Sequence, residues 1–327
     1  MKLQLHTNNM MFKDAITATA QQMGIPQIYI EKDYWITLAL KAIFSSDITN
    51  EAVFKGGTAL SKCYHLINRF SENIDLVVLK KPGETDGALK RKIKAITTLV
   101  GTIIPEITVE GITHKVGMLR KTAHQYIRTD SSNQYGEVRE HIVIEATWLG
   151  NAEPYVIADV NSYVTDMMIS TGQQDLVHEY SMESFPVRVL TKQRTLCEKI
   201  MSLVRFSQTV QPYNDLANKI RHIYDIYCLL GDTETAEFFG SGEFDKMMLS
   251  VKTDDLLSFK NNNQWLIHHP KDAIIFSHPS DTWERIKTPY QTTFKDLLMG
   301  ELPAESDLIT SIEKVAHRLQ KLNWSII

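Results

Sequence analysis

The stretch that most restricts the fold lies at residues 53–78, VFKGGTALSKCYHLINRFSENIDLVV. Two apolar residues lead into the glycine pair Gly56 and Gly57, and residues 74–79 have the composition of a β-strand. Glycines at a junction between a strand and a helix let backbone N–H groups approach a phosphate. Positions 73 and 75 are two apart on the strand, so their side chains project from one face. A pair of acids at that spacing could hold Mg²⁺ against the phosphates of a nucleotide.

Two motifs in this stretch carry a resemblance to a known family. GGTALSK followed by RFSENID resembles the signature of the AbiEii and MenT nucleotidyltransferase toxins, members of the DNA-polymerase-β-like superfamily. The resemblance is specific because both motifs occur at the family's separation, whereas a glycine pair alone is often only a tight turn between core elements. The segments EKDYW, RTLCEKI and RHIYDIYCLL extend the likeness, which spans about residues 26–230.

One position departs from the family's pattern. The first acid of the pair is replaced by Asn73, where the family has aspartate. Asparagine can coordinate a metal through its carbonyl oxygen, but it brings no charge and therefore holds Mg²⁺ less strongly. The sequence leaves open whether this asparagine is natural or introduced. It also leaves open a weakened or inactive regulatory protein that binds NTP without transferring it.

The resemblance implies two groups of ligand-binding residues. A divalent cation, Mg²⁺ or Mn²⁺, would be held by Asn73, Asp75 and Glu145. The phosphates of an NTP would be cradled by Gly56, Gly57, Thr58, Ser61 and Lys62.

The resemblance also implies catalytic residues in the C-terminal half, in addition to Asp75. Lys199 and Asp225 match the functional lysine and acid of the family's later motifs. Either Lys62 or Lys199 would neutralise phosphate, and Asp225 would position Lys199 or act as a base. His222 stands where the family often has an acid, and it receives no role.

The residue pattern of the strand predicted at 141–150 is a second reason to single out Glu145. Ile142, Ile144 and Ala146 would face one side of the sheet, and Glu145 the other. A lone carboxylate among β-branched residues is a poor core residue unless it has a partner. The position suits the third acid of the superfamily's metal site, and an edge-strand acid facing water is the alternative.

The chain as a whole is predicted to be α+β. A nucleotidyltransferase-type mixed sheet with flanking helices would occupy residues 1–184, and a mainly helical domain would occupy residues 185–327. Periodic apolar residues predict helices over 25–44, 88–100 and 307–322, strands within 104–128, and a loop at 211–215. In the first of these helices, Glu31, Lys32 and Asp33 would form a solvated first turn, or Lys32 or Asp33 would face the nucleotide.

The formal charge of −4 offers no global case for nucleic-acid binding, so any such surface must be local. Between residues 185 and 225, seven cations outnumber three acids, which indicates a basic groove for a polyanion. Two further groups are ambiguous between surface charge and contacts to RNA or triphosphate. They are the helical cluster Lys90, Arg91, Lys92 and Lys94, and the strand-end group Arg120, Lys121 and Arg128.

The resemblance implies a toxin of a bacterial toxin–antitoxin or abortive-infection (phage defence) system. It would transfer NMP from an NTP to an acceptor, with tRNA expected, and an antitoxin would be its partner. Three widely spaced cysteines form no zinc pattern, and no signal peptide or membrane span is seen, so a cytoplasmic protein is expected. A P-loop kinase or ATPase is the weakest alternative, because KGGTALSK lacks the glycine immediately before lysine.

Overall fold

A computed structural model describes residues 3–129, 138–259 and 262–324. The chain forms two compact units, which we describe separately. The first comprises Met1–Tyr64, Phe70–Trp148 and Tyr155–Val189, and the second comprises His65–Arg69, Leu149–Pro154 and Leu190–Ile327. The predicted division into domains after residue 184 stays a proposal, because compact units describe contacts and not independent folding.

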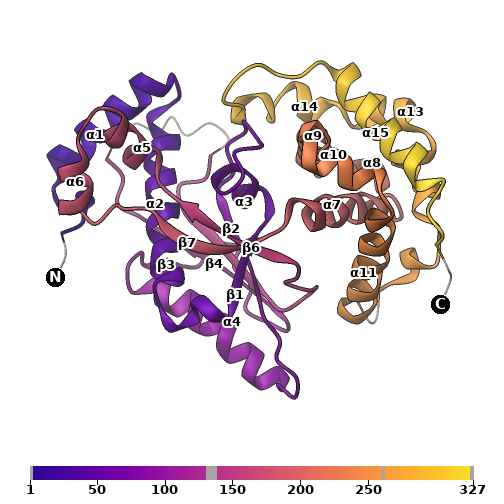
Figure 1. Cartoon of the computed structure of the whole chain (residues 1–327), viewed down its shortest axis with the longest axis horizontal. Coiled ribbons are helices and arrows are strands. Elements are labelled where there is room, and N and C mark those ends of the chain that lie inside the picture. The colour runs from indigo at the N-terminus through magenta and orange to yellow at the C-terminus, as the bar shows by residue number, and fades with distance from the viewer. Residues whose placement is uncertain (1–2, 130–137, 260–261, 325–327) are drawn as a thin grey trace. The chain divides into compact units, whose positions relative to one another are not determined.

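The first unit is built on a seven-stranded mixed sheet with the strand order β3-β4-β5-β2-β1-β7-β6 (Figure 1). Central strand β2 is antiparallel to β1 and parallel to β5, and β1 is parallel to β7. The mixed α+β architecture predicted from the sequence is confirmed. The strands are β1 Ala52–Lys55, β2 Asn73–Val78, β3 Glu106–Ile107, β4 Leu119–His124, β5 Ile142–Thr147, β6 Tyr155–Val160 and β7 Phe185–Leu190.

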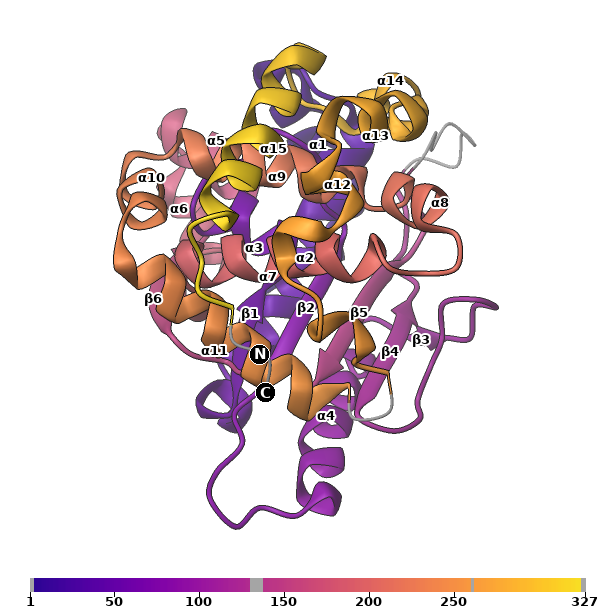
Figure 2. The same ribbon diagram turned by 90° about the vertical axis from the view of Figure 1, so that its right-hand side faces the viewer.

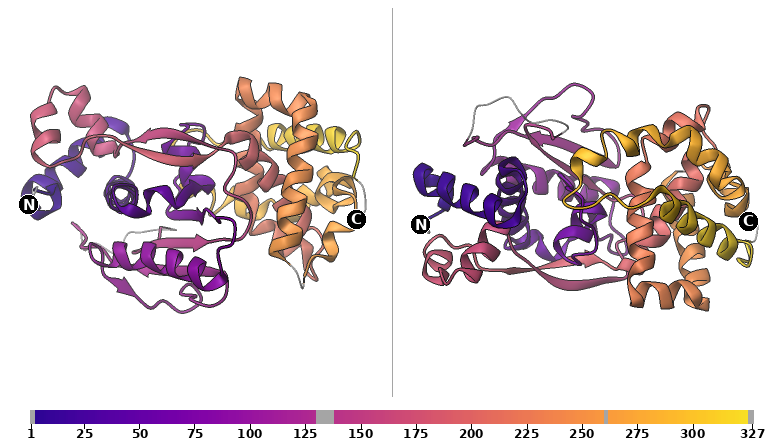
Figure 3. Two further views of the ribbon diagram at one scale, coloured as in Figure 1. Left: turned by 60° about the horizontal axis from the view of Figure 1, so that its bottom comes forward. Right: turned by 90° about the horizontal axis from the view of Figure 1, so that it is seen from above.

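Helices of the first unit bury one face of this sheet. Ile74, Leu76 and Ile144 alternate with polar residues along β2 and β5, and they are fully or almost fully buried in the hydrophobic core. Helix α4 contacts both β2 and β5, and α2 contacts β5; the left view of Figure 3 shows α4 next to the sheet. The helices of this unit are α1 Asn9–Met23, α2 Gln27–Phe44, α3 Gly56–Lys62, α4 Asp86–Gly101, α5 Tyr163–Ser170 and α6 Gln174–Glu179, with short 3₁₀ turns at Leu5–Thr7 and Asp47–Asn50.

The strands predicted over residues 104–128 are shorter than expected. Only β3 and β4 form, and the segment between them consists of turns and irregular chain, with one isolated β-bridge between His114 and Lys121. Gly111 and Gly117 have φ values of 74° and 72°, in the left-handed region that interrupts an extended strand.

The second unit is helical, and a threonine side chain caps its first long helix. The Thr191 side chain accepts a hydrogen bond from the backbone N–H of Arg194 at the start of α7. Helix α7 contacts both α9 and α11, and α15 contacts α9 (Figure 2). The helices are α7 Lys192–Phe206, α8 Pro212–Ala217, α9 Ile220–Gly231, α10 Thr233–Gly240, α11 Gly242–Ser258, α12 Ile274–Ser277, α13 Pro279–Ile286, α14 Thr288–Gln291 and α15 Glu305–Leu319, with 3₁₀ turns at Gln264–Leu266, Pro270–Asp272 and Lys295–Leu297.

The loop predicted at residues 211–215 is wrong, because α8 begins there. Pro212 occupies the first helical position, where its fixed φ suits the helix and its missing N–H is not needed. Among the helices of the described ranges, none combines the length and apolar character needed to cross a membrane.

Candidate active site

Two carboxylates lie side by side at the centre of the sheet. In the parallel pairing of β2 and β5, Asp75 is directly opposite Glu145. The row continues to Lys55 on β1 and Lys121 on β4, so four ionisable side chains project from one face across four neighbouring strands. The Lys121 ammonium lies 3.3 Å from a Glu145 carboxylate oxygen, and this cation offsets the repulsion expected between two adjacent acids.

The first glycine of the pair is required by the position of Asp75. Gly56 has a φ of +82°, and a Cβ added to it would lie 2.3 Å from the Oδ2 atom of Asp75. The carboxylate therefore packs directly against the glycine backbone. The Thr58 hydroxyl donates to the carbonyl oxygen of Asn73, which fastens α3 to the start of β2. The turn and the acid strand thus form one connected structure.

Asn73 is hydrogen-bonded to a residue that the sequence did not single out. Its Oδ1 atom accepts a hydrogen bond from Arg139 Nη1 at 3.1 Å. The same guanidinium nitrogen lies 3.3 Å from a carboxylate oxygen of Glu72, and the backbone N–H of Arg139 donates to Glu72 at 3.0 Å. Glu72 belongs to the RFSENID motif, and it is buried.

The interpretation of Glu31, Lys32 and Asp33 as a solvated first turn is wrong. All three side chains are buried within the first unit. Lys32 donates to Glu72 at 2.7 Å and to the carbonyl oxygen of Arg139 at 2.5 Å. Burial lowers the pKa of Lys32 to about 8, against the opposing effect of the Glu72 carboxylate. Sequence patterning missed this burial because charged residues in a first helical turn are usually solvated.

Lys62, a predicted phosphate ligand, already has an acidic partner. Its ammonium donates to Asp33 Oδ1 at 2.5 Å, and Asp33 Oδ2 accepts from the backbone N–H of Tyr163 at 2.8 Å. Both Lys62 and Asp33 are buried. A phosphate role for Lys62 stays a prediction, and it would require a buried ion pair to open. The Thr58 hydroxyl is also hydrogen-bonded already, to the carbonyl oxygen of Asn73, and the Ser61 hydroxyl is hydrogen-bonded to the Tyr163 side chain.

The second unit contains a separate cluster of buried charges. Asp225 accepts a hydrogen bond from Lys199 at 2.6 Å, and its two oxygens accept from Nε and Nη2 of Arg69, each at 2.8 Å. Asp225 is fully buried, and the two cations are almost fully buried. Burial alone would raise the pKa of Asp225, but Arg69 and Lys199 together hold it well below its usual value.

Arg69 is the residue of this cluster that sequence reasoning missed. It lies in the RFSENID motif, yet its carboxylate partner is 156 residues away in the chain. The sequence did contain a signal for it, because an arginine within a family motif commonly pairs with a carboxylate. Nothing local in the sequence indicates which acid it is.

The basic groove predicted for residues 185–225 is not supported, because several of its cations are already paired. Lys192 pairs with Asp232 and Glu234, and Arg194 pairs with Glu198 and Asp254. Most of these acids lie beyond the counted window, so a local charge count overestimates the positive potential.

The three cations Arg120, Lys121 and Arg128 do not converge on one site. Arg120 and Lys121 are consecutive on β4 and therefore face opposite sides of the sheet. Lys121 belongs to the carboxylate row, whereas Arg128 pairs with Glu140 at 3.2 Å. Of the helical cations, Lys92 pairs with Glu51 and Glu84.

The carboxylate row fits part of the predicted metal site. Carboxylate oxygens are the ligands that Mg²⁺ prefers, and one or two of them commonly suffice when phosphates and water complete the shell. Asp75 and Glu145 supply such oxygens, whereas the Asn73 oxygen is engaged by Arg139. Within the described ranges, no group of three or more His, Cys, Asp and Glu side chains is arranged to hold a metal.

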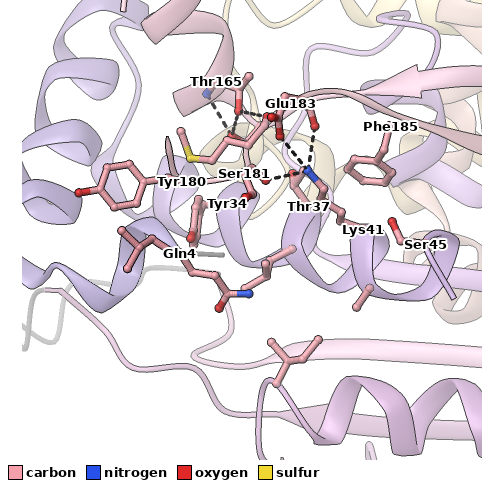
Figure 4. Close-up of a pocket in the computed structure, with 16 residues that line it drawn as sticks. Gln4, Tyr34, Thr37, Lys41, Ser45, Thr165, Tyr180, Ser181, Glu183 and Phe185 are labelled. Atoms are coloured by element: carbon pink, nitrogen blue, oxygen red, sulfur yellow. Dashed lines mark hydrogen bonds and ion pairs between the residues drawn. The ribbon is translucent and has the colours of Figure 1, made fainter. Parts of the chain in front are cut away.

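A cavity of about 260 Å³ in the first unit lies apart from these residues (Figure 4). Its lining includes Tyr34, Lys41 and Phe185, and none of the predicted site residues. Lys41 donates to the carbonyl oxygens of Ser181 and Glu183, so its ammonium is already hydrogen-bonded. The volume is below the range of about 300–1,000 Å³ that is usual for ligand pockets.

Comparison with known proteins agrees with the fold and the motifs. No curated protein matches the chain. A solved structure of MenT4, the nucleotidyltransferase toxin Rv2826c from Mycobacterium tuberculosis H37Rv, is similar with a TM-score of 0.54 and 15% sequence identity. The similarity covers 94% of this chain and 90% of MenT4, and it shows a shared fold. The family model described as "Nucleotidyl transferase AbiEii toxin, Type IV TA system" matches residues 38–308. The chain therefore belongs to the AbiEii family of nucleotidyltransferase toxins from type IV toxin–antitoxin systems.

Proposed function

We propose that this chain transfers a nucleotide from an NTP to the hydroxyl of an RNA acceptor, with tRNA as the acceptor class. The acceptor oxygen bonds to the α-phosphorus, the bond from that phosphorus to the bridging oxygen breaks, and pyrophosphate leaves. The hydroxyl proton passes to a base. An antitoxin partner and a nucleotide substrate follow from the family, and the acceptor is our proposal.

The observation that carries the proposal is the contact between Gly56 and Asp75, with Glu145 directly beside the acid. A backbone that can approach phosphate and a pair of adjacent carboxylates are the two parts that nucleotidyl transfer needs in one place. Mg²⁺ held by Asp75 and Glu145 would neutralise charge on the transferring phosphoryl group.

The low pKa of Asp225 favours one of its two predicted roles. A carboxylate with a strongly lowered pKa is a weak base at neutral pH. Asp225 would therefore orient Lys199 rather than accept the acceptor's proton, and the Lys199 ammonium would stabilise negative charge on the phosphates.

A second candidate function is a regulatory protein that binds NTP without transferring it. Asn73 favours this candidate, because a neutral amide engaged by Arg139 stands where the family has a charged acid. Losing one such stabilising charge costs about 3–4 kcal/mol, or a factor of roughly 10² to 10³ in rate.

The test is transfer of label from each of the four α-³²P NTPs to total bacterial RNA, with Mg²⁺ or with EDTA. We expect labelled RNA of tRNA size only with Mg²⁺, little or none with Asp75→Asn, and more with Asn73→Asp. Label that persists at the same rate in Asp75→Asn would contradict the proposed site. NTP binding without transfer by both the native chain and Asn73→Asp would favour the regulatory candidate.

A further inference from the structure

The segment around Arg139 is held in place by its backbone. Glu72 accepts a hydrogen bond from the Arg139 N–H, and Lys32 donates one to the Arg139 carbonyl oxygen. Lys32 and Glu72 also pair with each other at 2.7 Å and are buried. Removing two charges from water is costly unless they make further hydrogen bonds, and here both clamp the same residue. The position of Arg139 thus does not depend on its own side chain.

The Arg139 guanidinium remains accessible beside the carboxylate face. The side chain is 39% exposed, and it reaches Asn73, whose neighbour on the same face of β2 is Asp75. Among the described residues, its contacts run through a single nitrogen, Nη1. An arginine presents five N–H donors in a planar fork that matches the oxygens of a phosphate group.

The local charges leave this cluster with an excess cation. Lys32 and Arg139 share the single carboxylate of Glu72, and Lys32 makes the closer contact, 2.7 Å against 3.3 Å. Asn73 orients the guanidinium without neutralising it, which an aspartate at this position would do. A buried acid already neutralised by Lys32 does not need the arginine for its own stability.

We propose that Arg139 is a phosphate-binding residue, and that its guanidinium contacts the polyphosphate of the nucleotide next to Asn73. This inference deepens the proposed function and rests on it for the identity of the ligand. Asn73 holds the guanidinium in place, and the Lys32–Glu72 pair fixes the backbone beneath it. The ligand class is a polyphosphate, with or without a nucleoside attached.

The test is calorimetric titration of the full-length protein with inorganic tripolyphosphate and with each NTP, in EDTA and in Mg²⁺. Arg139→Gln removes the charge but keeps the backbone clamp, Arg139→Lys keeps the charge without the fork, and Arg285→Gln is the control at an exposed arginine of α13. We expect Arg139→Gln to weaken binding of both ligands by roughly 10- to 100-fold, as for loss of a hydrogen bond to a charged group. The affinity of Arg139→Lys should lie between those of Arg139→Gln and the native chain, and Arg285→Gln should bind like the native chain.

Asn73→Asp provides a second, independent arm in EDTA. The new carboxylate would pair with the guanidinium, so tripolyphosphate binding should weaken even if Arg139→Gln proves too unstable to study. Equal NTP affinity of Arg139→Gln and the native chain would overturn the inference and leave the transferase proposal standing. Tripolyphosphate binding that requires Arg139 in a chain that labels no RNA would support the inference and contradict the transferase proposal. A native chain that binds neither ligand overturns the inference, and the labelling assay then decides the function separately.

Discussion

Replacing Asp225 with asparagine should destabilise the second unit strongly. The side chain is fully buried and accepts three hydrogen bonds from two cations, Arg69 and Lys199. The amide is nearly the same size, so packing changes little, but both cations lose their counter-charge. Breaking a buried ion pair by removing one partner costs about 3–5 kcal/mol. For a unit of this size that corresponds to a fall in Tm of roughly 10–15 °C.

The assay is urea and thermal unfolding followed by circular dichroism, with two comparison variants. Glu313→Gln makes the same acid-to-amide change at an exposed position of α15 and should alter stability by less than about 0.5 kcal/mol. Arg69→Met leaves Asp225 paired with Lys199 one to one, so it should cost less than Asp225→Asn. An Asp225→Asn variant within about 1 kcal/mol of the native chain would refute the reasoning, as would a greater loss in Arg69→Met.

Three further predictions concern the turn, a helix cap and pH. Gly56→Ala should cost more than the roughly 1–2 kcal/mol of a left-handed alanine, because it also displaces the Asp75 carboxylate. Gly24 has a φ of +67° and open space around it, so Gly24→Ala measures the backbone cost alone. Equal losses of thermal stability in Gly56→Ala and Gly24→Ala would contradict the contact between Gly56 and Asp75. Thr191→Ala should lower the free energy of unfolding by about 1 kcal/mol through loss of the N-cap, and an unchanged urea midpoint would argue against the cap. The pKa of Asp225 is lower in the folded state, so its contribution is full above about pH 4 and is lost as pH falls towards the folded-state pKa. Asp225→Asn should therefore lose less stability than the native chain on acidification from pH 4 to pH 2.

The sequence alone predicted the central strand–turn–helix–strand segment and the family. Gly56 and residues 74–79 were identifiable because glycine before a helix and an apolar run before a polar loop are local patterns. The alternation of side chains along β5 is also a local pattern, and it placed Glu145 on the face opposite to Ile142 and Ile144. The helices predicted over residues 25–44, 88–100 and 307–322 were recognised by apolar periodicity, which also depends on near neighbours in the chain.

The partners of the charged residues were decided by the tertiary structure. Register places Glu145 directly beside Asp75, and a shift of one residue would send it to the opposite face. Arg69 finds its acid 156 residues away, and Lys32 finds Glu72 across 40 residues. Neither pairing can be read from a window of sequence, because a charge needs a specific partner only once folding has removed it from water. Local patterns therefore determined the elements and the family, and burial determined which charges hold one another and which remain accessible to a ligand.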